Sequence, residues 1–406
     1  MVSPVRTKED DISSLILASL SLTRYACSSL TQLSGGSINF LFRGTLLDAL
    51  ASVEDAGGHA STTETSETVI LKYSTAFLSV NPDFPIDISR SFTEEAMLQA
   101  LESFHPQASS RSLAGTDIQV KTPHLYLLDR ANSIIQVHQD LSPSRDFKSI
   151  LLTAAGQDTD QSFHVFARNT GAALGSWLKA FHEWADEPAQ RALCNAIERN
   201  SGPMRKLKYD TSYDTFISVL EKFPEILDHG TRKDLQRVKD MATSEFEKPL
   251  ASSEDLEASW GLVHGDFWTG NVLVPEHASS SLQDEMFVID WELAQPGHRA
   301  YDLGQMFGDL YERKHFKGVE SAFEALQGFA SGYGGMADEL AFRTAIHAGV
   351  HLIHWYNRRV PTAPLDAPPD KVLEAMTTAK DWILRGYERD KIWFQTSALS
   401  CLWEHL

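Results

Sequence analysis

The chain has 406 residues, which is more than a single hydrophobic core usually fills, so we expect two domains. Its hydrophobic content of 42% and charged content of 22% are those of an ordinary globular protein. The net charge of −19 argues against nucleic acid or an anionic membrane as the main partner, because both would be repelled on average. Cys27, Cys194 and Cys401 are too few and too far apart for a disulfide framework or a zinc site, and a reducing compartment is expected.

Near the beginning, the apolar run 15–20 follows acidic residues at 9–11. A secretion signal places basic residues there, so this run is interpreted as an amphipathic helix. No later segment reaches the ~18 to 20 apolar residues that a membrane span requires. The predicted location is the cytoplasm.

A glycine turn is predicted between strands near 28–34 and 40–47, with the sequence Gly35-Gly36-Ser37-Ile38-Asn39. Such a turn lets backbone N–H groups approach phosphates, although hairpins of every kind contain similar turns. The next strand, 68–73, contains Lys72, and a helix is predicted over 91–104. Glu94 or Glu95 on that helix could pair with the lysine, and Glu94 is the preferred partner.

Two short strands at 124–129 and 133–138 complete a mostly β N-terminal part. The residues that follow, 139–142, are interpreted as a hinge whose backbone could bind an adenine edge, with an ordinary strand exit as the equal alternative.

The rest of the chain is predicted to be mainly helical. Leu174, Trp177, Leu178 and Phe181 follow a helical spacing within 169–185, and His182 on the same helix is interpreted as a core histidine. Residues 190–260 are helix-prone and highly charged, which favours a solvated exterior. That interpretation includes the lysines at 206, 208, 222 and 233.

Two apolar runs at 262–274 and 287–292 each lead to an acidic residue, Asp266 and Asp290, and Asn271 follows five positions after the first. Phosphoryl transfer needs a carboxylate to orient and deprotonate the attacking hydroxyl, and hard oxygen ligands for Mg²⁺. Asp266 can be that carboxylate, while Asn271 and Asp290 can be the ligands. The pattern therefore predicts a phosphoryl-transfer site.

Further along, Asp302 lies near the start of a predicted helix. It is either a favourable charge at the helix N-terminus or a brace for the loop from His264 to Asp266. A later helix over 346–359 carries His347, His351 and His354 at helical spacing. Substrate contact or packing is favoured over a metal site there, because an H-E-x-x-H pattern is missing.

These motifs resemble the aminoglycoside phosphotransferase and choline kinase group. The stretch from His264 through Asp266 to Asn271 matches its H-x-D-x-x-x-x-N loop, and Ile289-Asp290-Trp291-Glu292 matches its metal-binding segment. Together with the glycine turn, Lys72, Glu94 and residues 139–141, which precede these motifs, the match covers most of the chain in the right order. The resemblance implies an α+β, bilobal protein kinase-like fold with an N-lobe at 1–138, a hinge at 139–142 and a mostly helical C-lobe at 143–406.

The resemblance also implies ATP and Mg²⁺ as cofactors and a small-molecule hydroxyl as acceptor. Asp266 would be the catalytic base, Asn271 and Asp290 the metal ligands, and Glu292 a further metal or substrate contact. Support of the catalytic loop would fall to His264 and Asp302. ATP binding would involve Gly35, Gly36, Ser37, Asn39, Lys72, Glu94, His138, Gln139, Asp140 and Leu141.

The acceptor stays open between sugars, amino alcohols and aromatic alcohols. The chain is most similar to methylthioribose kinases and related enzymes, with hydroxytryptamine, ketosamine and aminoglycoside as alternative substrate classes. Candidates for the acceptor pocket are Trp268, Trp291, Trp355, Arg358 and Arg359. A nucleotide-binding pseudokinase that acts as an interaction module is the alternative function. It is disfavoured because Lys72, Asp266, Asn271 and Asp290 are all present.

Overall fold

A computed structural model describes residues 8–34, 36, 38–51, 65–106, 117–131, 134–153, 155, 161–248, 259–276, 283–358 and 364–404. The chain divides into two compact units. The first contains residues 1–99 and 123–142, and the second contains 100–122 and 143–406. The first unit is therefore not the continuous segment 1–138 that the sequence predicted. Residues 100–122 join the second unit because the strand within them pairs there.

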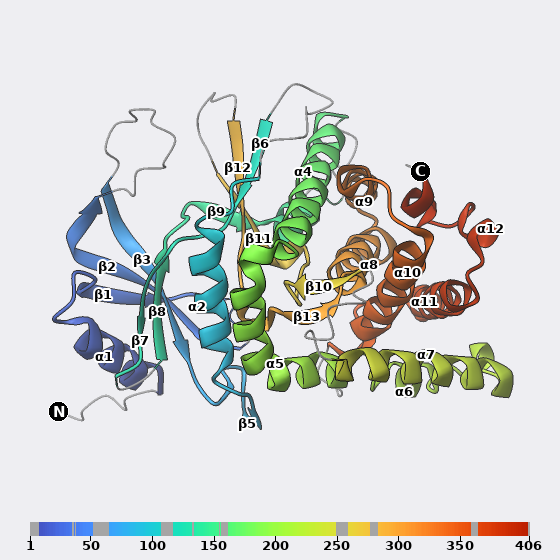
Figure 1. Cartoon of the computed structure of the whole chain (residues 1–406), viewed down its shortest axis with the longest axis horizontal. Coiled ribbons are helices and arrows are strands. Elements are labelled where there is room, and N and C mark those ends of the chain that lie inside the picture. Colours follow the sequence, from blue (N-terminus) through green and yellow to red (C-terminus); the bar gives the residue numbers. More distant parts are fainter. Residues whose placement is uncertain are drawn as a thin grey trace. The chain divides into compact units, whose positions relative to one another are not determined.

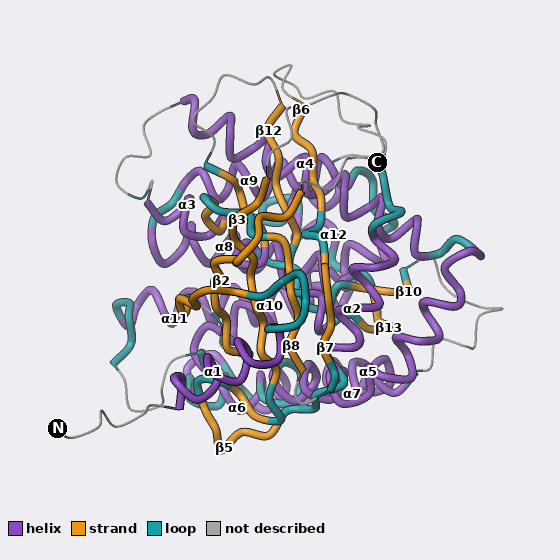
Figure 2. Tube along the Cα trace, turned by 90° about the vertical axis from the view of Figure 1, so that its left-hand side faces the viewer, coloured by secondary structure: helices purple, strands orange, loops and turns teal. Residues whose placement is uncertain are grey.

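The first unit is built on a five-stranded antiparallel sheet in the order β1-β2-β3-β8-β7. Figure 2 shows β2, β3 and β8 side by side. Apolar side chains of these strands, such as Phe42 and Leu71, form a core with Ile12 and Ile16 of helix α1. The bounds are α1 (Lys8–Leu20), β1 (Cys27–Gln32), β2 (Phe40–Ala51), β3 (Thr65–Ser74), β7 (Leu125–Asp129) and β8 (Ile134–Gln139).

One further helix, α2 (Arg90–Leu101), follows the small hairpin of β4 (Phe77–Leu78) and β5 (Asn81–Pro85). In the sheet, Lys72 of β3 lies opposite Leu41 on one side and Gln136 on the other. Lys72 is therefore held on a central strand. The glycine turn predicted near 35–39 does connect two antiparallel strands, β1 and β2.

The second unit contains two small sheets. One has the order β6-β12-β11-β9, in which β6 (Asp117–Lys121) runs parallel to β12 (Gln283–Val288). Within that sheet β11 (Val272–Pro275) is antiparallel to both β12 and β9 (Ser144–Asp146). The other sheet pairs β10 (Trp260–Val263) with β13 (Gln295–His298) in antiparallel fashion. These short strands carry the loops that hold Asp266 and Asp290.

Helices make up most of the second unit. The helix predicted over 169–185 is present as α4 (Gln161–Ala185), and it begins eight residues earlier than its apolar spacing indicated. It packs closely against α9 (Glu320–Tyr333), as Figure 1 shows. A Cβ on Gly328 would lie 2.0 Å from the backbone oxygen of Arg168, so glycine is required for this approach.

The second unit contains eight further helices among the described residues. They are α3 (Phe147–Thr153), α5 (Arg191–Thr211), α6 (Phe216–Leu220), α7 (His229–Glu247), α8 (Ala300–Lys317), α10 (Asp338–His354), α11 (Pro369–Glu388) and α12 (Lys391–Phe394). Short 3₁₀ turns are η1 (Pro188–Gln190), η2 (Pro224–Ile226), η3 (Thr269–Asn271), η4 (Trp291–Leu293), η5 (Trp355–Asn357) and η6 (Ser400–Trp403).

The first unit combines an antiparallel sheet with helices α1 and α2, and the second unit is larger and mainly helical. This arrangement confirms the predicted α+β fold class. Among the described residues, no helix is both long enough and apolar enough to cross a membrane.

Candidate active site

The loop that follows β10 carries Asp266 and ends in η3 and β11. Its end is tied to the next strand, because the backbone carbonyl of Asn271 accepts the N–H of Ile289 at 3.0 Å. Pairing of Val272 with Val288 continues the same ladder. The strand that begins after Asn271 and the strand that ends before Asp290 are thus neighbours, as the sequence predicted.

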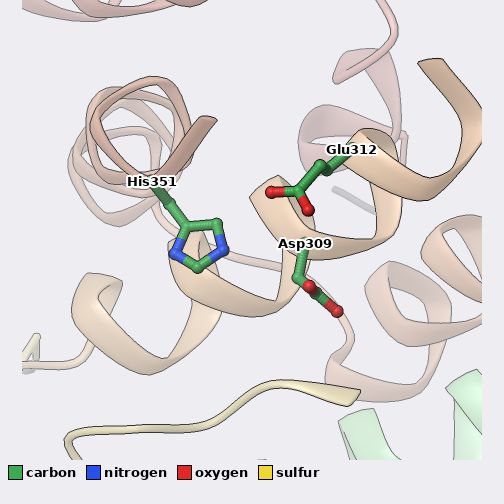
Figure 3. Close-up of side chains that lie close together, drawn as sticks. All are labelled: Asp309, Glu312 and His351. Carbon is green, nitrogen blue, oxygen red and sulfur yellow. The ribbon is translucent and has the colours of Figure 1, made fainter. Parts of the chain in front are cut away.

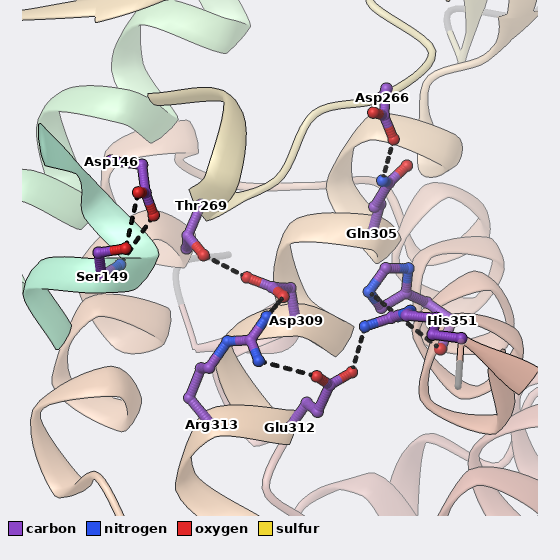
Figure 4. A network of polar contacts seen from close by, with 10 residues as sticks. Asp146, Ser149, Asp266, Thr269, Gln305, Asp309, Glu312, Arg313 and His351 are labelled. Atoms are coloured by element: carbon purple, nitrogen blue, oxygen red, sulfur yellow. Dashed lines mark hydrogen bonds and ion pairs between the residues drawn. The ribbon is translucent and has the colours of Figure 1, made fainter. Parts of the chain in front are cut away.

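Both carboxylate oxygens of Asp266 accept a hydrogen bond from a side-chain amide. Asn271 Nδ2 donates to Asp266 Oδ2 at 3.0 Å and to the Asp266 backbone oxygen at 2.9 Å. Gln305 Nε2 donates to Asp266 Oδ1 at 2.5 Å, and Figure 4 shows this contact. Because an ionised carboxylate oxygen has two lone pairs, each oxygen can still accept another proton donor.

One face of α8 holds the Asp266 loop at three successive points. Asp302 accepts the backbone N–H groups of His264 at 2.8 Å and Gly265 at 2.9 Å. Gln305 contacts Asp266, and Asp309 accepts a hydrogen bond from the Thr269 hydroxyl. Asp302, Gln305 and Asp309 follow the i, i+3, i+7 spacing of a single helix face. Gln305 and Asp309 were not singled out by the sequence analysis, although their helical spacing from Asp302 was the available signal.

Asp302 is fully buried and also contacts the buried His182, whose Nε2 lies 3.3 Å from Asp302 Oδ2. Burial by itself would raise the pKa of Asp302, but hydrogen bonding from His182 and the loop N–H groups holds that pKa below its usual value. Burial lowers the pKa of His182 despite its acidic partner. A neutral His182 that donates from Nε2 can accept the Tyr333 hydroxyl at Nδ1, 3.1 Å away.

His264 holds the loop from its other side. Its Nε2 lies 3.0 Å from the backbone oxygen of Ile289, and its Nδ1 accepts the backbone N–H of Asp266 at 3.2 Å. These partners require the tautomer with the proton on Nε2. The imidazole also packs on the Trp291 ring at a centroid distance of 4.4 Å. His264 therefore links the Asp266 loop to the segment that precedes Asp290.

Two backbone positions in this region have positive φ. Gly265 has φ of 82°, and a Cβ there would lie 2.1 Å from the backbone oxygen of Leu293. Asp290 has φ of 68° and ψ of 58°, in the left-handed region that residues other than glycine rarely adopt. Such strain persists where surrounding contacts over-determine it and is frequent at functional sites. Glu292, two residues later, is buried.

A cavity of about 440 Å³ opens beside Asp266 within the second unit. Its wall comes from α5, α8, α10 and the segments that follow α5 and α10. The lining residues are Lys208, Asp210, Thr211, Ser212, Thr215, Asp266, Gln305, His347, Val350, His351, His354, Asn357 and Arg358.

Lys208 is a cavity residue, which corrects its assignment to a solvated exterior. Its Nζ donates to Gln305 Oε1 at 2.5 Å. Burial lowers the pKa of Lys208, and the negative charge of Asp266 opposes that effect. The lysine was assigned to the surface because α5 is highly charged, and sequence alone does not show which face of α5 turns toward α8.

The three histidines of α10 line the cavity through neutral hydrogen-bonded rings. His347 Nδ1 lies 3.0 Å from the Tyr213 hydroxyl, and His354 Nε2 lies 2.9 Å from the backbone oxygen of Ser212. Burial lowers the pKa of His354 to about 4 and moves the pKa values of His347 and His351 well below their usual value. These contacts agree with packing or substrate contact, which the sequence analysis favoured over a metal site for the three histidines.

Asp309, Glu312 and His351 place ligand atoms within 4.8 Å of one another. Figure 3 shows these three side chains. Both carboxylates already have cationic partners, however. Arg313 donates to Asp309 at 2.5 Å and to Glu312 at 2.9 Å, and Arg358 donates to Glu312 at 2.7 Å (Figure 4). A metal would have to displace these guanidinium groups, so the cluster is interpreted as an ionic network.

Of the aromatic residues assigned to the acceptor pocket, Trp291 is buried against His264 and Phe181. The ring centroids of Trp291 and Phe181 lie 5.1 Å apart. Trp355 stacks on Phe316 at 3.9 Å. Trp268 packs against Gly270 and the ammonium of Lys148, 5.1 Å from its ring. These three tryptophans are not among the residues that line the cavity, because each ring packs on protein neighbours.

The two arginines that were also predicted to line the acceptor pocket are Arg358 and Arg359. Arg358 lines the cavity, where it also donates to His351 Nε2 at 2.7 Å. Arg359 lies outside the described residues.

In the first unit, the predicted partners Lys72 and Glu94 form a buried ion pair. Lys72 Nζ lies 2.8 Å from Glu94 Oε2, and the two side chains are 8% and 3% exposed. The alternative partner, Glu95, pairs with Arg130 instead. The helix phase of α2 thus decides between the two glutamates.

The predicted glycine loop is described in part, since Gly35 and Ser37 lie outside the described residues. A Cβ on Gly36 would lie 2.5 Å from the backbone oxygen of Asn39, so the turn requires glycine at that position. The Asn39 side chain is buried and accepts a hydrogen bond from Arg90 at 2.8 Å. Asn39 therefore has a structural contact, and its predicted role in ATP binding stays a prediction.

At the predicted hinge, the side chain of Asp140 accepts Arg43 Nε at 2.6 Å and the Thr68 hydroxyl at 2.8 Å. The N–H of Gln139 donates to the backbone oxygen of His124 at 2.9 Å, and His138 pairs within the sheet. These contacts anchor the strand exit. Adenine binding by His138, Gln139, Asp140 and Leu141 stays a prediction.

A comparison with protein families finds that residues 112–339, more than half of the chain, match the phosphotransferase enzyme family. The chain belongs to this family. It is therefore a phosphotransferase, and the family resemblance of its motifs is confirmed.

Curated relatives extend over most of the chain. A phosphotransferase named FrzJ from Cladobotryum sp is 29% identical over 391 residues, which cover 95% of this chain and 94% of that protein. A 4-hydroxytryptamine kinase from Psilocybe cubensis is 24% identical over 338 residues, which cover 81% and 80% of the two chains.

Among solved structures, an ethanolamine kinase from Plasmodium vivax has a TM-score of 0.46 and 14% identity, over 96% of this chain and 92% of that one. A choline/ethanolamine kinase family protein from Mesorhizobium loti has a TM-score of 0.44 and 14% identity, over 98% and 99%.

Proposed function

We propose that this phosphotransferase moves the γ-phosphoryl group of ATP to a hydroxyl of a small molecule held in the cavity beside Asp266. The observation that carries the proposal is the position of Asp266, which lines the cavity while both its oxygens are held by the amides of Asn271 and Gln305. A cavity of about 440 Å³ is in the range that encloses small ligands.

Asp266 would act as the base. One of its free lone pairs accepts the proton of the acceptor hydroxyl while the hydroxyl oxygen bonds to the γ-phosphorus. The bond from that phosphorus to the oxygen it shares with the β-phosphate breaks, and ADP leaves. The amide donors of Asn271 and Gln305 keep the carboxylate in a single orientation, so it does not have to reorganise during the reaction.

The residues present fit Mg²⁺. Asn271 uses its Nδ2 on Asp266, which fixes the amide so that its oxygen faces away as a neutral ligand. Asp290 offers a carboxylate from a strained backbone position next to the same strand pair. Oxygen ligands of this kind suit a hard cation. Mg²⁺, when bound, supplies neutralisation of the phosphate charge, and Glu292 would be either a third ligand or a substrate contact.

Lys72 would bind phosphate oxygens of the nucleotide, with Glu94 orienting its ammonium. A cation that is buried on a central strand and paired with a buried carboxylate is well positioned, which is what recognition of a phosphate requires.

For the acceptor, the cavity supports a compound with hydrogen-bonding groups, because lysine, arginine, serine, threonine and three histidines line it. The 4-hydroxytryptamine kinases among the relatives favour testing aromatic alcohols first. Sugars and amino alcohols remain in the proposed range.

The test is the release of ADP in the presence of Mg²⁺ across a panel that contains methylthioribose, 4-hydroxytryptamine, ethanolamine, a ketosamine and an aminoglycoside. We expect at least one acceptor to raise ADP release above the acceptor-free rate and to gain one phosphoryl group by mass spectrometry. Asp266→Ala is the matched inactive control. ATP binding without any phosphorylated acceptor would instead favour the interaction-module alternative.

A further inference from the structure

The amide of Gln305 lies between two charged groups that determine its orientation. A lysine ammonium only donates hydrogen bonds, so the Gln305 atom 2.5 Å from Lys208 Nζ must be the amide oxygen. The amide nitrogen then faces Asp266 Oδ1, also at 2.5 Å. With the amide reversed, an ammonium would face an N–H₂ group and a carboxylate would face an oxygen, and both contacts would repel.

We propose that Lys208 and Gln305 are positioning residues, through which α5 and α8 set the orientation of the Asp266 carboxylate. This proposal rests on the proposed function of Asp266 as the base. Lys208 selects the orientation of the Gln305 amide, and that amide holds Asp266 Oδ1. Asn271 holds Oδ2, so the plane of the carboxylate is defined from both sides.

The surroundings make this chain of contacts rigid. Gln305 is only 4% exposed, and its neighbour Gly304 packs directly on His347 of α10, where an added Cβ would lie 2.6 Å from the His347 Cβ. Lys208 reaches Gln305 from α5 across a sequence separation of 97 residues. A charged donor at one end of an amide strengthens the hydrogen bond at the other end by polarisation.

Lys208 also lines the cavity, so direct binding of the acceptor is the competing role. The two roles differ in kinetics. A residue that binds the acceptor equally in the ground and transition states changes KM, whereas a residue that orients the base changes kcat.

The kinetic experiment uses the full-length chain with the best acceptor from the panel. Lys208→Met and Gln305→Leu are each expected to lower kcat about tenfold, with an acceptor KM within about twofold of wild type. Lys208→Arg keeps a donor and should recover most of the activity. The double variant should be no slower than Gln305→Leu alone, because both residues act through one contact.

The matched control is Lys206→Met, on the same helix, because the Lys206 side chain is 74% exposed and contacts Asp210. It should leave kcat unchanged. A rise of acceptor KM at constant kcat in Lys208→Met, or additive losses in the double variant, would overturn the positioning role.

A second readout is independent of turnover. In protein labelled with ¹⁵N in glutamine side chains, the amide signal of Gln305 is the one that Gln305→Glu removes. It should move in Lys208→Met and in Asp266→Asn and stay in place in Lys206→Met. If Lys208→Met leaves it in place, the proposal fails whatever the kinetics. If the signals move while the panel yields no phosphorylated acceptor, the contact chain stands and the proposed function fails.

Discussion

The backbone N–H of His264 donates to the carboxylate of Asp302 at 2.8 Å, across 38 residues of sequence. The same carboxylate accepts the N–H of Gly265, so a buried negative charge on α8 holds the start of the Asp266 loop. This contact explains why an acidic residue lies here in the first turn of a helix whose N-terminus also favours negative charge.

Asp302→Asn should destabilise the protein and lower activity. Asparagine offers a single acceptor oxygen, so one of the two loop N–H groups would face an N–H₂ group. Hydrogen bonds to charged groups contribute about 2 kcal/mol each, and a loss of that order in the free energy of unfolding is expected from urea titration. Asp338→Asn, at a surface position of α10, is the control. Equal stability of the two variants would contradict this role of Asp302.

Asp266→Ala should abolish turnover while ATP binding remains. The base is lost, which costs roughly 10² to 10⁴ in rate for general-base catalysis, whereas the proposed metal and phosphate contacts stay in place. Calorimetric titration with Mg·ATP and the rate of ADP release are to be measured on the same preparation. A parallel collapse of affinity and rate would show that Asp266 holds the nucleotide instead.

Asp290→Ala should weaken the binding of Mg·ATP itself. The substitution removes a proposed ligand of the metal. It is not expected to relax the backbone, because alanine tolerates the positive φ of position 290 no better than aspartate does. The measurement is the Mg²⁺ concentration required for half-maximal activity, compared with wild type and with Asp284→Ala as the control in the preceding strand. An unchanged Mg²⁺ requirement would disprove the ligand assignment.

Lys72→Met should raise the KM for ATP and also destabilise the first unit. Once Lys72 is replaced, the buried carboxylate of Glu94 loses this cationic partner, which costs roughly 3 kcal/mol in the free energy of unfolding. Adding Glu94→Gln should restore most of the stability but not the affinity for ATP. Thermal unfolding and ATP titration separate these two effects, and Lys121→Met, which breaks a half-exposed pair with Glu285, is the control. Recovery of both properties in the double variant would argue against phosphate binding by Lys72.

Stability should fall as the pH decreases below 6.5, in part because of His298. Burial lowers the pKa of His298 to about 3, from an ordinary value of 6.5. Between these two values the unfolded chain binds a proton that the folded protein does not, so acid favours unfolding by about 1.4 kcal/mol per pH unit for this one group. At higher pH both states are neutral and the contribution is constant.

His298→Asn should flatten this dependence in urea titrations between pH 7 and pH 5. Asparagine can replace Nδ1 as the acceptor of the Ala300 N–H, which now lies 3.2 Å away. His229→Asn, at an exposed position, serves for comparison. An unaltered slope in His298→Asn would contradict the buried neutral state.

Local patterns predicted part of this fold well. The apolar spacing of α4 placed a helix at 169–185, and the strands around the glycine turn pair as expected. The error over residues 100–122 arose because pairing of β6 with β12 joins segments more than 160 residues apart, and short-range periodicity contains no information about that pairing. Trp291 was assigned to a ligand pocket for a similar reason, since an aromatic residue next to a motif can equally pack beneath it.

The sequence by itself was enough to propose the site: Asp266, Asn271 and Asp290 next to predicted strands, and Lys72 with a glutamate on the next helix. Those assignments depend on short spacings within one or two elements, which backbone geometry converts directly into position. The tertiary structure decided that Glu94 pairs with Lys72, that α8 braces the loop, and that Lys208 and Gln305 reach Asp266 beside a cavity. These relationships depend on which face each helix turns toward its neighbours, and that is settled by packing between segments distant in sequence.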